Sequence, residues 1–180
     1  MNSYVKFFLV LFLVVAISCG LLALVNRQTH PIIKQNKALT QEKARRDMIP
    51  SADDFTKVTV NDFEYYKALD VNKNLLGYTF LAKQKGYSGL IEVMVAVNTS
   101  FEIIRIMVIT QTETPGLGTQ VTLPKFADMF IGLVKSEIKI DREGGKIVNI
   151  TGATISTNAV TKAIANDLQR LEKAAQEEDK

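Results

Sequence analysis

The stretch LIEVMVAVNTSFEIIRIMVITQ, from Leu90 to Gln111, predicts the fold of this chain. Its two halves, Leu90–Asn98 and Ile103–Gln111, are rich in the β-branched residues that favour strands. The residues between them, Thr99–Glu102, are typical of a hairpin connection. Asn98-Thr99-Ser100 also matches a glycosylation acceptor, but the hairpin turn explains it better. Two long apolar strands joined in this way predict the central antiparallel pair of a β-sheet.

The segments on both sides of this hairpin predict one α+β domain built on an antiparallel sheet. The predicted strands are Phe55–Val60, Leu75–Lys83, Ile138–Ile140 and Ile147–Ile150, the last two around the Gly144-Gly145 turn. A short helix is expected at Leu123–Leu133, with Phe126, Met129, Phe130 and Leu133 on one face. A longer helix is expected from about Thr157 to Ala175, with an apolar stripe of Ala159, Ile164, Leu168 and Leu171. The polar tail 176–180 is expected to fray.

The N-terminal region holds the longest apolar run of the chain. Residues Phe7–Val25 read FFLVLFLVVAISCGLLALV, which is 19 residues without a charged side chain. As a helix this run is about 28 Å long, close to the thickness of the hydrocarbon core of a bilayer. A lipoprotein signal is the alternative, since Ala16–Cys19 loosely resembles a lipobox, but the apolar run continues past Cys19. The run therefore predicts an uncleaved transmembrane anchor within residues 1–28.

Residues 29–50 predict a stalk helix that continues from the anchor. Pro31 suits the first turn of a helix and Pro50 closes one, and the residues between them are helical in composition. One lysine, Lys6, precedes the apolar run, whereas Arg27, Lys34, Lys37, Lys43, Arg45 and Arg46 follow it. The positive-inside rule, applied to this count alone, predicts that the domain lies in the cytoplasm.

The composition excludes several classes of function. The chain has one Cys and one His, so it can form neither an internal disulfide nor a zinc site of the Cys/His kind. A catalytic Cys–His pair is not expected, because Cys19 lies inside the apolar run. A net charge of +3 is too small to indicate nucleic-acid binding. The sequence therefore predicts a membrane-anchored chain with no metal site and no nucleic-acid partner.

Three glycine-containing segments lie at the ends of predicted elements, where binding sites usually form. They are GYSGL at Gly86–Leu90, ETPGLG at Glu113–Gly118 and TGAT at Thr151–Thr154. The free N–H groups at the start of the last helix attract an anion, and Gly152 with Ala153 leaves the backbone open to a phosphate. The candidate binding residues are Tyr87, Ser88, Gly89, Glu113, Thr114, Pro115, Gly116, Leu117, Gly118, Thr151, Gly152, Ala153, Thr154, Ser156 and Thr157.

Two of these segments also have a purely local explanation. Ser156 or Thr157 can serve as the N-cap of the last helix. Pro115-Gly116 is typical of a type II turn, in which Gly118 relieves the next bend. A turn does not require Glu113 in front of it or a second glycine after it, and this extra detail suits a backbone that lies against a planar ligand.

Taken together, GYSGLI, ETPGLG and TGATISTNAV, in this order behind one anchor, resemble the flavin-bearing G subunit of the Rnf electron-transport complex. The C subunit of the sodium-pumping NADH:quinone reductase shares the same FMN-binding domain. The resemblance covers most of the chain, and Phe126, Phe130 and Gly132 fit it as well. The combination of Ser/Thr-Gly-Ala-Thr with ETPGLG is specific, whereas either motif alone would be weak.

In the family that the chain resembles, FMN is attached covalently through a phosphoester to the last Thr of the Ser/Thr-Gly-Ala-Thr motif, which implies Thr154 here. Thr151–Ala153 would form the approach read by a separate flavin transferase, which takes FMN from FAD with magnesium. ETPGLG and GYSGL would line the flavin, with Tyr87 near its ring. One position departs from the family pattern, because Val148 stands six residues before Thr154, where the family often has Asp.

The resemblance implies an electron relay without independent substrate turnover. The partners would be the other membrane subunits of a complex that couples ferredoxin and NAD chemistry to ion movement. The FMN-binding domain, residues 51–175, would lie outside the cytoplasmic membrane. The count of basic residues predicts the opposite side, but the positive-inside rule is weaker for long translocated domains. Three alternatives stay open: the C subunit of the quinone reductase, for which the chain is short; a membrane-anchored binding or assembly protein without flavin; and a soluble-type flavoenzyme with substrate turnover.

Overall fold

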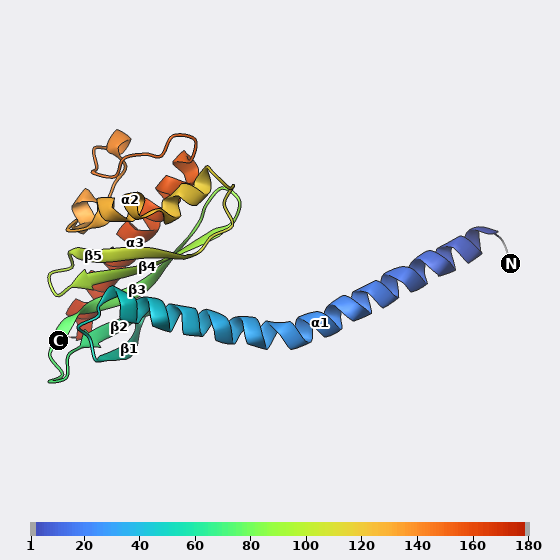
Figure 1. The fold of residues 1–180 in the computed structure, drawn as a ribbon, viewed down its shortest axis with the longest axis horizontal. Coiled ribbons are helices and arrows are strands. Elements are labelled where there is room, and N and C mark those ends of the chain that lie inside the picture. Colours follow the sequence, from blue (N-terminus) through green and yellow to red (C-terminus); the bar gives the residue numbers. More distant parts are fainter. Residues whose placement is uncertain (1–2, 179–180) are drawn as a thin grey trace. The chain divides into compact units, whose positions relative to one another are not determined.

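The computed structural model describes residues 3–178 of the chain (Figure 1). The chain forms two compact units, one up to Thr40 and one from Gln41 onward. The helices are α1 (Ser3–Met48), α2 (Pro124–Ala127) and α3 (Thr154–Glu178), and the strands are β1 (Asp54–Val60), β2 (Phe63–Leu69), β3 (Leu75–Lys85), β4 (Leu90–Asn98) and β5 (Ile103–Thr110). The predicted fold class, an apolar N-terminal helix followed by an α+β domain with an antiparallel sheet, is confirmed.

The sheet is a meander in which each strand pairs with its neighbours in the sequence. The strand order is β1-β2-β3-β4-β5, and all four pairings are antiparallel (Figure 1). The predicted hairpin is confirmed as β4 and β5, with Val95 opposite Ile106. Its predicted central place is wrong, because β5 is an edge strand and β3 lies in the middle.

Strand β2 was not predicted from the sequence, so the expected sheet lacked the strand that lies between β1 and β3. The segment FEYYKAL alternates in burial, with Phe63 and Tyr65 turned into the core. It follows β1 through Asn61 and Asp62, whose φ angles of 47° and 61° are typical of a type I′ hairpin turn. The Asn-Asp pair between two alternating runs was the signal that could have revealed this strand.

The turn between β4 and β5 is held by the side chain of Asn98. Its Oδ1 accepts hydrogen bonds from the backbone N–H groups of Ser100, at 2.9 Å, and Glu102, at 3.0 Å. Its Nδ2 donates to the carboxylate of Glu102 at 2.8 Å. The amide that matches a glycosylation acceptor is therefore used to form the turn.

The main core lies between one face of the sheet and α3 (Figure 1). Alternate residues of β4 point to this face, and all of them are fully buried: Ile91, Val93, Val95 and Val97. The predicted stripe of α3 meets them, since Ala159, Ile164, Leu168 and Leu171 are buried in the same cluster. Burial of each large side chain stabilises the fold by about 1.5–3 kcal/mol. On the other face, a smaller cluster is formed by Met48, Ile49, Ala68, Met94 and Ala96.

Helix α3 is longer at both ends than the sequence predicted. It begins at Thr154 and continues to Glu178, so the expected fraying does not apply to residues 176–178. The carboxylate of Glu178 pairs with Lys67 at 2.6 Å and accepts a hydrogen bond from the Tyr65 hydroxyl at 2.8 Å. These contacts with β2 hold the polar end of the helix against the sheet.

The segment before α3 is more irregular than predicted. The expected helix at Leu123–Leu133 is interrupted after α2, because the chain turns to pair with the start of β5: the Gly132 N–H donates to the Ile103 carbonyl at 2.8 Å. Phe126 and Phe130 are nevertheless buried, as the pattern predicted. The prediction of two short strands at 138–140 and 147–150 is wrong, because these segments form only an isolated bridge between Ile140 and Ile147.

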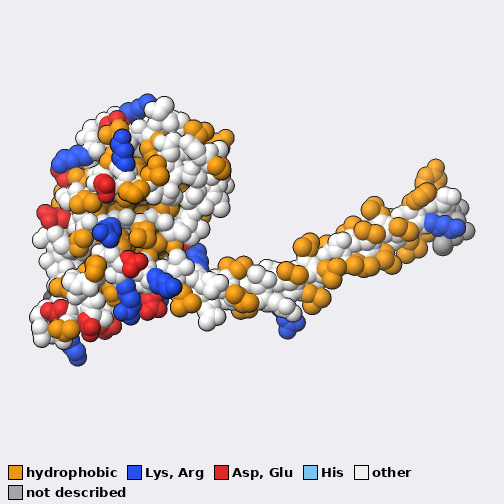
Figure 2. Space-filling model, viewed as in Figure 1, with side chains coloured by type: hydrophobic (Ala, Val, Ile, Leu, Met, Phe, Trp, Pro, Cys, Tyr) orange, Lys and Arg blue, Asp and Glu red, His pale blue; other side chains and the backbone are white. Residues whose placement is uncertain are grey.

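Helix α1 is long and apolar enough to cross a membrane. Its large apolar side chains from Phe7 to Val25 are exposed, which a water-soluble helix would avoid (Figure 2). Pro31 lies inside this helix rather than in a first turn, so one continuous helix extends from Ser3 to Met48.

Candidate functional site

The loop Gly86–Leu90 and the first turns of α3 meet at the carboxylate of Glu113. Its oxygens accept hydrogen bonds from the backbone N–H groups of Tyr87, at 3.1 Å, Ser88, at 3.0 Å, and Gly89, at 3.4 Å. The hydroxyl of Ser156, in the first turns of α3, donates to the same carboxylate. One buried side chain of ETPGLG therefore joins the loop before β4 to the start of the last helix.

These hydrogen bonds keep Glu113 ionised. Burial by itself would raise the pKa of this carboxyl, because it disfavours the charged form. The hydrogen bonds from Ser156 and from the backbone N–H groups of Ser88, Tyr87 and Gly89 outweigh burial and leave the pKa below its ordinary value. Glu113 is thus a buried anion whose charge is satisfied by the protein.

The glycines of these segments leave room for this contact. A Cβ atom on Gly118 would lie 2.7 Å from Glu113 Cβ and 2.8 Å from Ser156 Oγ. A Cβ atom on Gly86 would lie 2.7 Å from Glu113 Oε1. Gly116 has a φ of +78°, and the Leu117 N–H donates to the Thr114 carbonyl at 3.2 Å, as in the type II turn predicted for Pro115-Gly116.

The hydroxyl residues at the start of α3 have other roles than the predicted cap. Ser156 and Thr157 are buried and come after Thr154, the first residue of the helix, so the prediction that either is its N-cap is wrong. Thr157 Oγ1 accepts a weak hydrogen bond from the Ile150 N–H at 3.4 Å. Thr154 is the first helical residue and half-buried, and its Oγ1 accepts a hydrogen bond from Asn149 Nδ2 at 2.9 Å.

A cavity of about 530 Å³ opens beside Thr154. It takes its walls from all three segments, and its lining residues are Tyr87, Glu113, Thr114, Leu117, Gly118, Gly152, Ala153, Thr154, Ile155 and Ser156. Thr151 lines a neighbouring cavity of about 650 Å³ with Val148 and Asn149. Ser88 and Gly89 contribute backbone donors to Glu113, while Pro115, Gly116 and Thr157 line neither cavity. Ile155 and Asn149 were not among the predicted site residues: Ile155 is an apolar residue within TGATISTNAV, and Asn149 lies outside the three segments.

The cavity beside Thr154 has the size and chemistry that a flavin nucleotide needs. Its volume lies within the range of about 300–1,000 Å³ that is typical of small-ligand pockets. Tyr87, Leu117 and Ile155 place exposed apolar surface on its walls, which suits a planar aromatic ring. The hydroxyl of Thr154 and the start of α3 lie in the same wall, which suits a phosphate. The residues present therefore fit FMN.

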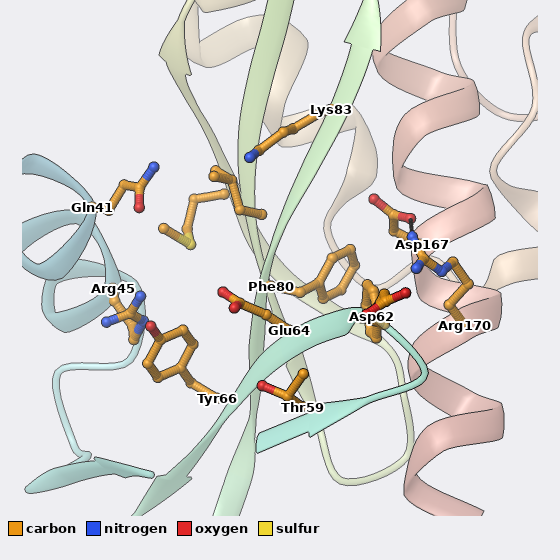
Figure 3. A pocket seen from close by; sticks show the side chains of 13 residues that line it. Gln41, Arg45, Thr59, Asp62, Glu64, Tyr66, Phe80, Lys83, Asp167 and Arg170 are labelled. Atoms are coloured by element: carbon orange, nitrogen blue, oxygen red, sulfur yellow. Dashed lines mark hydrogen bonds and ion pairs between the residues drawn. The ribbon is translucent and has the colours of Figure 1, made fainter. Parts of the chain in front are cut away.

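Figure 3 shows a different cavity, of about 460 Å³, which contains none of the predicted site residues. It lies where β3 extends past β2, and charged side chains of both signs line it. The Arg45 guanidinium lies 3.4 Å from the centroid of the Tyr66 ring, and Asp167 pairs with Arg170 at 3.2 Å. This balance of charges favours no class of ligand.

Comparisons with known proteins show similarity to one domain family and to subunits of redox complexes. Residues 86–169 match the family described as the FMN-binding domain. The G subunit of an "Ion-translocating oxidoreductase complex" of Methanosarcina acetivorans is 33% identical over 83% of this chain and 84% of the relative. The G subunit of a "Proton-translocating ferredoxin:NAD(+) oxidoreductase complex" of Clostridium ljungdahlii is 31% identical over 86% and 84%. A solved structure of the C subunit of the Na(+)-translocating NADH-quinone reductase from Parabacteroides distasonis is 24% identical, with a TM-score of 0.49 over 59% of each chain.

The fold and the site define a protein with one FMN-binding domain behind a single apolar helix. These two relatives carry the same subunit letter and are matched over more than four-fifths of their length. The chain belongs to the family of the G subunits of the Rnf-type ion-translocating oxidoreductase complexes.

Proposed function

We propose that this chain is the membrane-anchored, electron-carrying subunit of an ion-translocating oxidoreductase of the ferredoxin:NAD type, with FMN held by a phosphoester on Thr154. The observation that carries the proposal is the convergence of the three segments on one cavity whose wall includes the Thr154 hydroxyl. The family membership supports the oxidoreductase complex, because the relatives are named as its G subunit.

Different residues of the cavity would bind different parts of FMN. Thr154 would hold the phosphate, while Tyr87, Leu117 and Ile155 would cover the ring. When bound, FMN supplies one-electron and two-electron transfer chemistry. Glu113 would keep the three segments in place, because its carboxylate is already occupied by protein donors.

A covalent bond is proposed because the attraction between the phosphate and the start of α3 is too small to retain the flavin by itself. The start of a helix favours an anion by about 0.3–1 kcal/mol, whereas micromolar retention needs about 8 kcal/mol. A bond to Thr154 would keep the flavin at the site irrespective of the concentration of free FMN. A flavin transferase would form this bond, with FAD as the donor of FMN.

Within this proposal, residues 1–28 are the anchor, 29–50 the stalk, 51–175 the FMN-binding domain and 176–180 a polar tail. The domain would lie on the extracytoplasmic side of the cytoplasmic membrane. The partners would be the other membrane subunits, and the complex as a whole would act as the translocase.

The test is an intact mass and a peptide map of the full chain after co-expression with a flavin transferase. We expect the peptide with Thr154 to gain the mass of one FMN less one water, and Thr154→Ala to abolish this gain. Thr122→Ala, which removes an exposed hydroxyl that donates to the Thr119 carbonyl, serves as the control. An unmodified peptide beside an active transferase would contradict the tether and favour a binding or assembly protein without flavin.

A further inference from the structure

Asn149 contacts the hydroxyl at which the proposed bond forms. Its Nδ2 donates a hydrogen bond to Thr154 Oγ1 at 2.9 Å, across five residues of chain. Asn149 lies outside the three segments and lines the neighbouring cavity with Val148 and Thr151. The amide therefore reaches Thr154 from outside the proposed flavin cavity.

The backbone around Asn149 is tied to the first turn of α3. The Ala153 N–H donates to the Ile150 carbonyl at 3.0 Å, and the Ile150 N–H donates to Thr157 Oγ1 at 3.4 Å. Ile147, two residues before Asn149, is fully buried in the main core. The segment that carries the amide is thus joined by backbone hydrogen bonds to the helix start that carries the hydroxyl.

The other end of the same amide has no partner within residues 3–178. Asn149 Oδ1 is buried and accepts no hydrogen bond from any residue that the structure describes. An amide that served the fold alone would be expected to pair both of its polar ends. The hydrogen bond that the Asn149 side chain does make is directed to Thr154.

The direction of this hydrogen bond suits an ester oxygen. A free threonine hydroxyl can donate and accept, whereas an oxygen esterified to phosphorus has no hydrogen and can only accept. Because Nδ2 is the donor, the same contact can persist before and after the bond forms. It also leaves a second lone pair of Oγ1 for the phosphorus.

We infer that Asn149 is a positioning residue that holds Thr154 Oγ1 for the transfer of FMN, an inference that rests on the proposed function. In this step Thr154 Oγ1 forms a bond to the flavin-side phosphorus of FAD, and the P–O bond of the diphosphate breaks. AMP is the leaving group, and the hydroxyl proton passes to a base of the transferase. No oxidation or reduction takes place.

The test is a time course of FMN attachment to the purified full-length chain in detergent, with FAD, magnesium and a flavin transferase, read by intact mass. Loss of one positioning hydrogen bond corresponds to a rate about three- to tenfold lower for Asn149→Ala. Asn149→Asp has the same shape but cannot donate, and its charge repels phosphate, so we expect at least as large a loss. Asn158→Ala, a half-buried amide on α3 that does not line the flavin cavity, should be labelled at the wild-type rate.

Varying the chain concentration separates positioning from folding. Loss of positioning lowers the kcat of labelling and leaves the KM for the chain unchanged, whereas a disordered loop raises the KM. Wild-type rates for both Asn149 variants, or a raised KM with unchanged kcat, would overturn the inference. A wild-type chain that receives no FMN, beside a related G subunit that does, would instead reject the proposed function and the inference with it.

Discussion

The carboxylate of Glu113 accepts a hydrogen bond from the hydroxyl of Ser156, which lies 43 residues further along the chain. The same carboxylate accepts the backbone N–H groups of Tyr87, Ser88 and Gly89. This side chain also lines the cavity beside Thr154. This anion therefore joins the loop 87–89 and the first turns of α3 to ETPGLG.

Removal of the Glu113 carboxylate should destabilise the domain. Glu113→Ala leaves the donors of Ser156 and of the 87–89 loop without their acceptor in a buried place, which costs about 1–3 kcal/mol. Urea unfolding followed by circular dichroism measures the loss. Glu143→Ala, at an exposed carboxylate in the turn before Gly144, is the control and should change stability little. Equal stabilities of the two variants would show that the contact is not required for folding.

The same carboxylate should make stability depend on pH. Its folded pKa lies below the ordinary value of 4.5, so its contribution is fully present above that value and is lost as the pH falls through the folded pKa. Unfolding free energies measured between neutral and acidic pH should therefore fall more steeply for the wild type than for Glu113→Gln. The pKa values of Glu137 and Glu178 are also lowered, so these residues make stability fall with falling pH in both proteins. Their contributions cancel when the two pH profiles are subtracted. Parallel pH profiles of the two proteins would contradict the lowered pKa of Glu113 in the folded state.

Gly118→Ala should disturb the contact between Glu113 and Ser156 through crowding. The added Cβ atom would lie 2.7 Å from Glu113 Cβ, and overpacking of this kind typically costs about 1–3 kcal/mol. Gly144→Ala provides the comparison, because its φ of +77° brings backbone strain while no atom lies within 4 Å of the added Cβ. We expect only Gly118→Ala to lower FMN attachment at Thr154, as measured by intact mass. If FMN attaches to Gly118→Ala as to the wild type, the cavity tolerates the added Cβ atom and the prediction is wrong.

The end of α3 should contribute to stability through Glu178. Glu178→Ala removes the ion pair with Lys67 and the hydrogen bond from Tyr65, which together contribute about 1 kcal/mol at this partly exposed site. The difference from wild type should shrink in high salt, because salt screens the ion pair. Glu172→Ala is the control within the same helix. A Glu178→Ala chain with wild-type stability at low salt would restore the expectation of a frayed tail.

The hairpin of β4 and β5 and the apolar stripe of α3 were predicted from the sequence because both depend on local periodicity. The strand β2 was missed because its alternating pattern mixes aromatic, acidic and basic residues, and its burial comes from contact with α3 and β3. The start of α3 was placed too late, since Ser156 and Thr157 are common capping residues. Their hydroxyls instead serve Glu113 and Ile150, which only the folded chain brings near them.

The sequence by itself determined the apolar helix, the antiparallel hairpin, and the three segments around Tyr87, Glu113 and Thr154, because residue type and spacing control each of these within a few residues of chain. Only the tertiary structure decided that these segments share one cavity and that the carboxylate of Glu113 is hydrogen-bonded to other parts of the protein. It also decided that Asn149 reaches the Thr154 hydroxyl. A buried carboxylate needs several donors at once, and the donors of Glu113 come from parts of the chain that meet only when the sheet and α3 pack together.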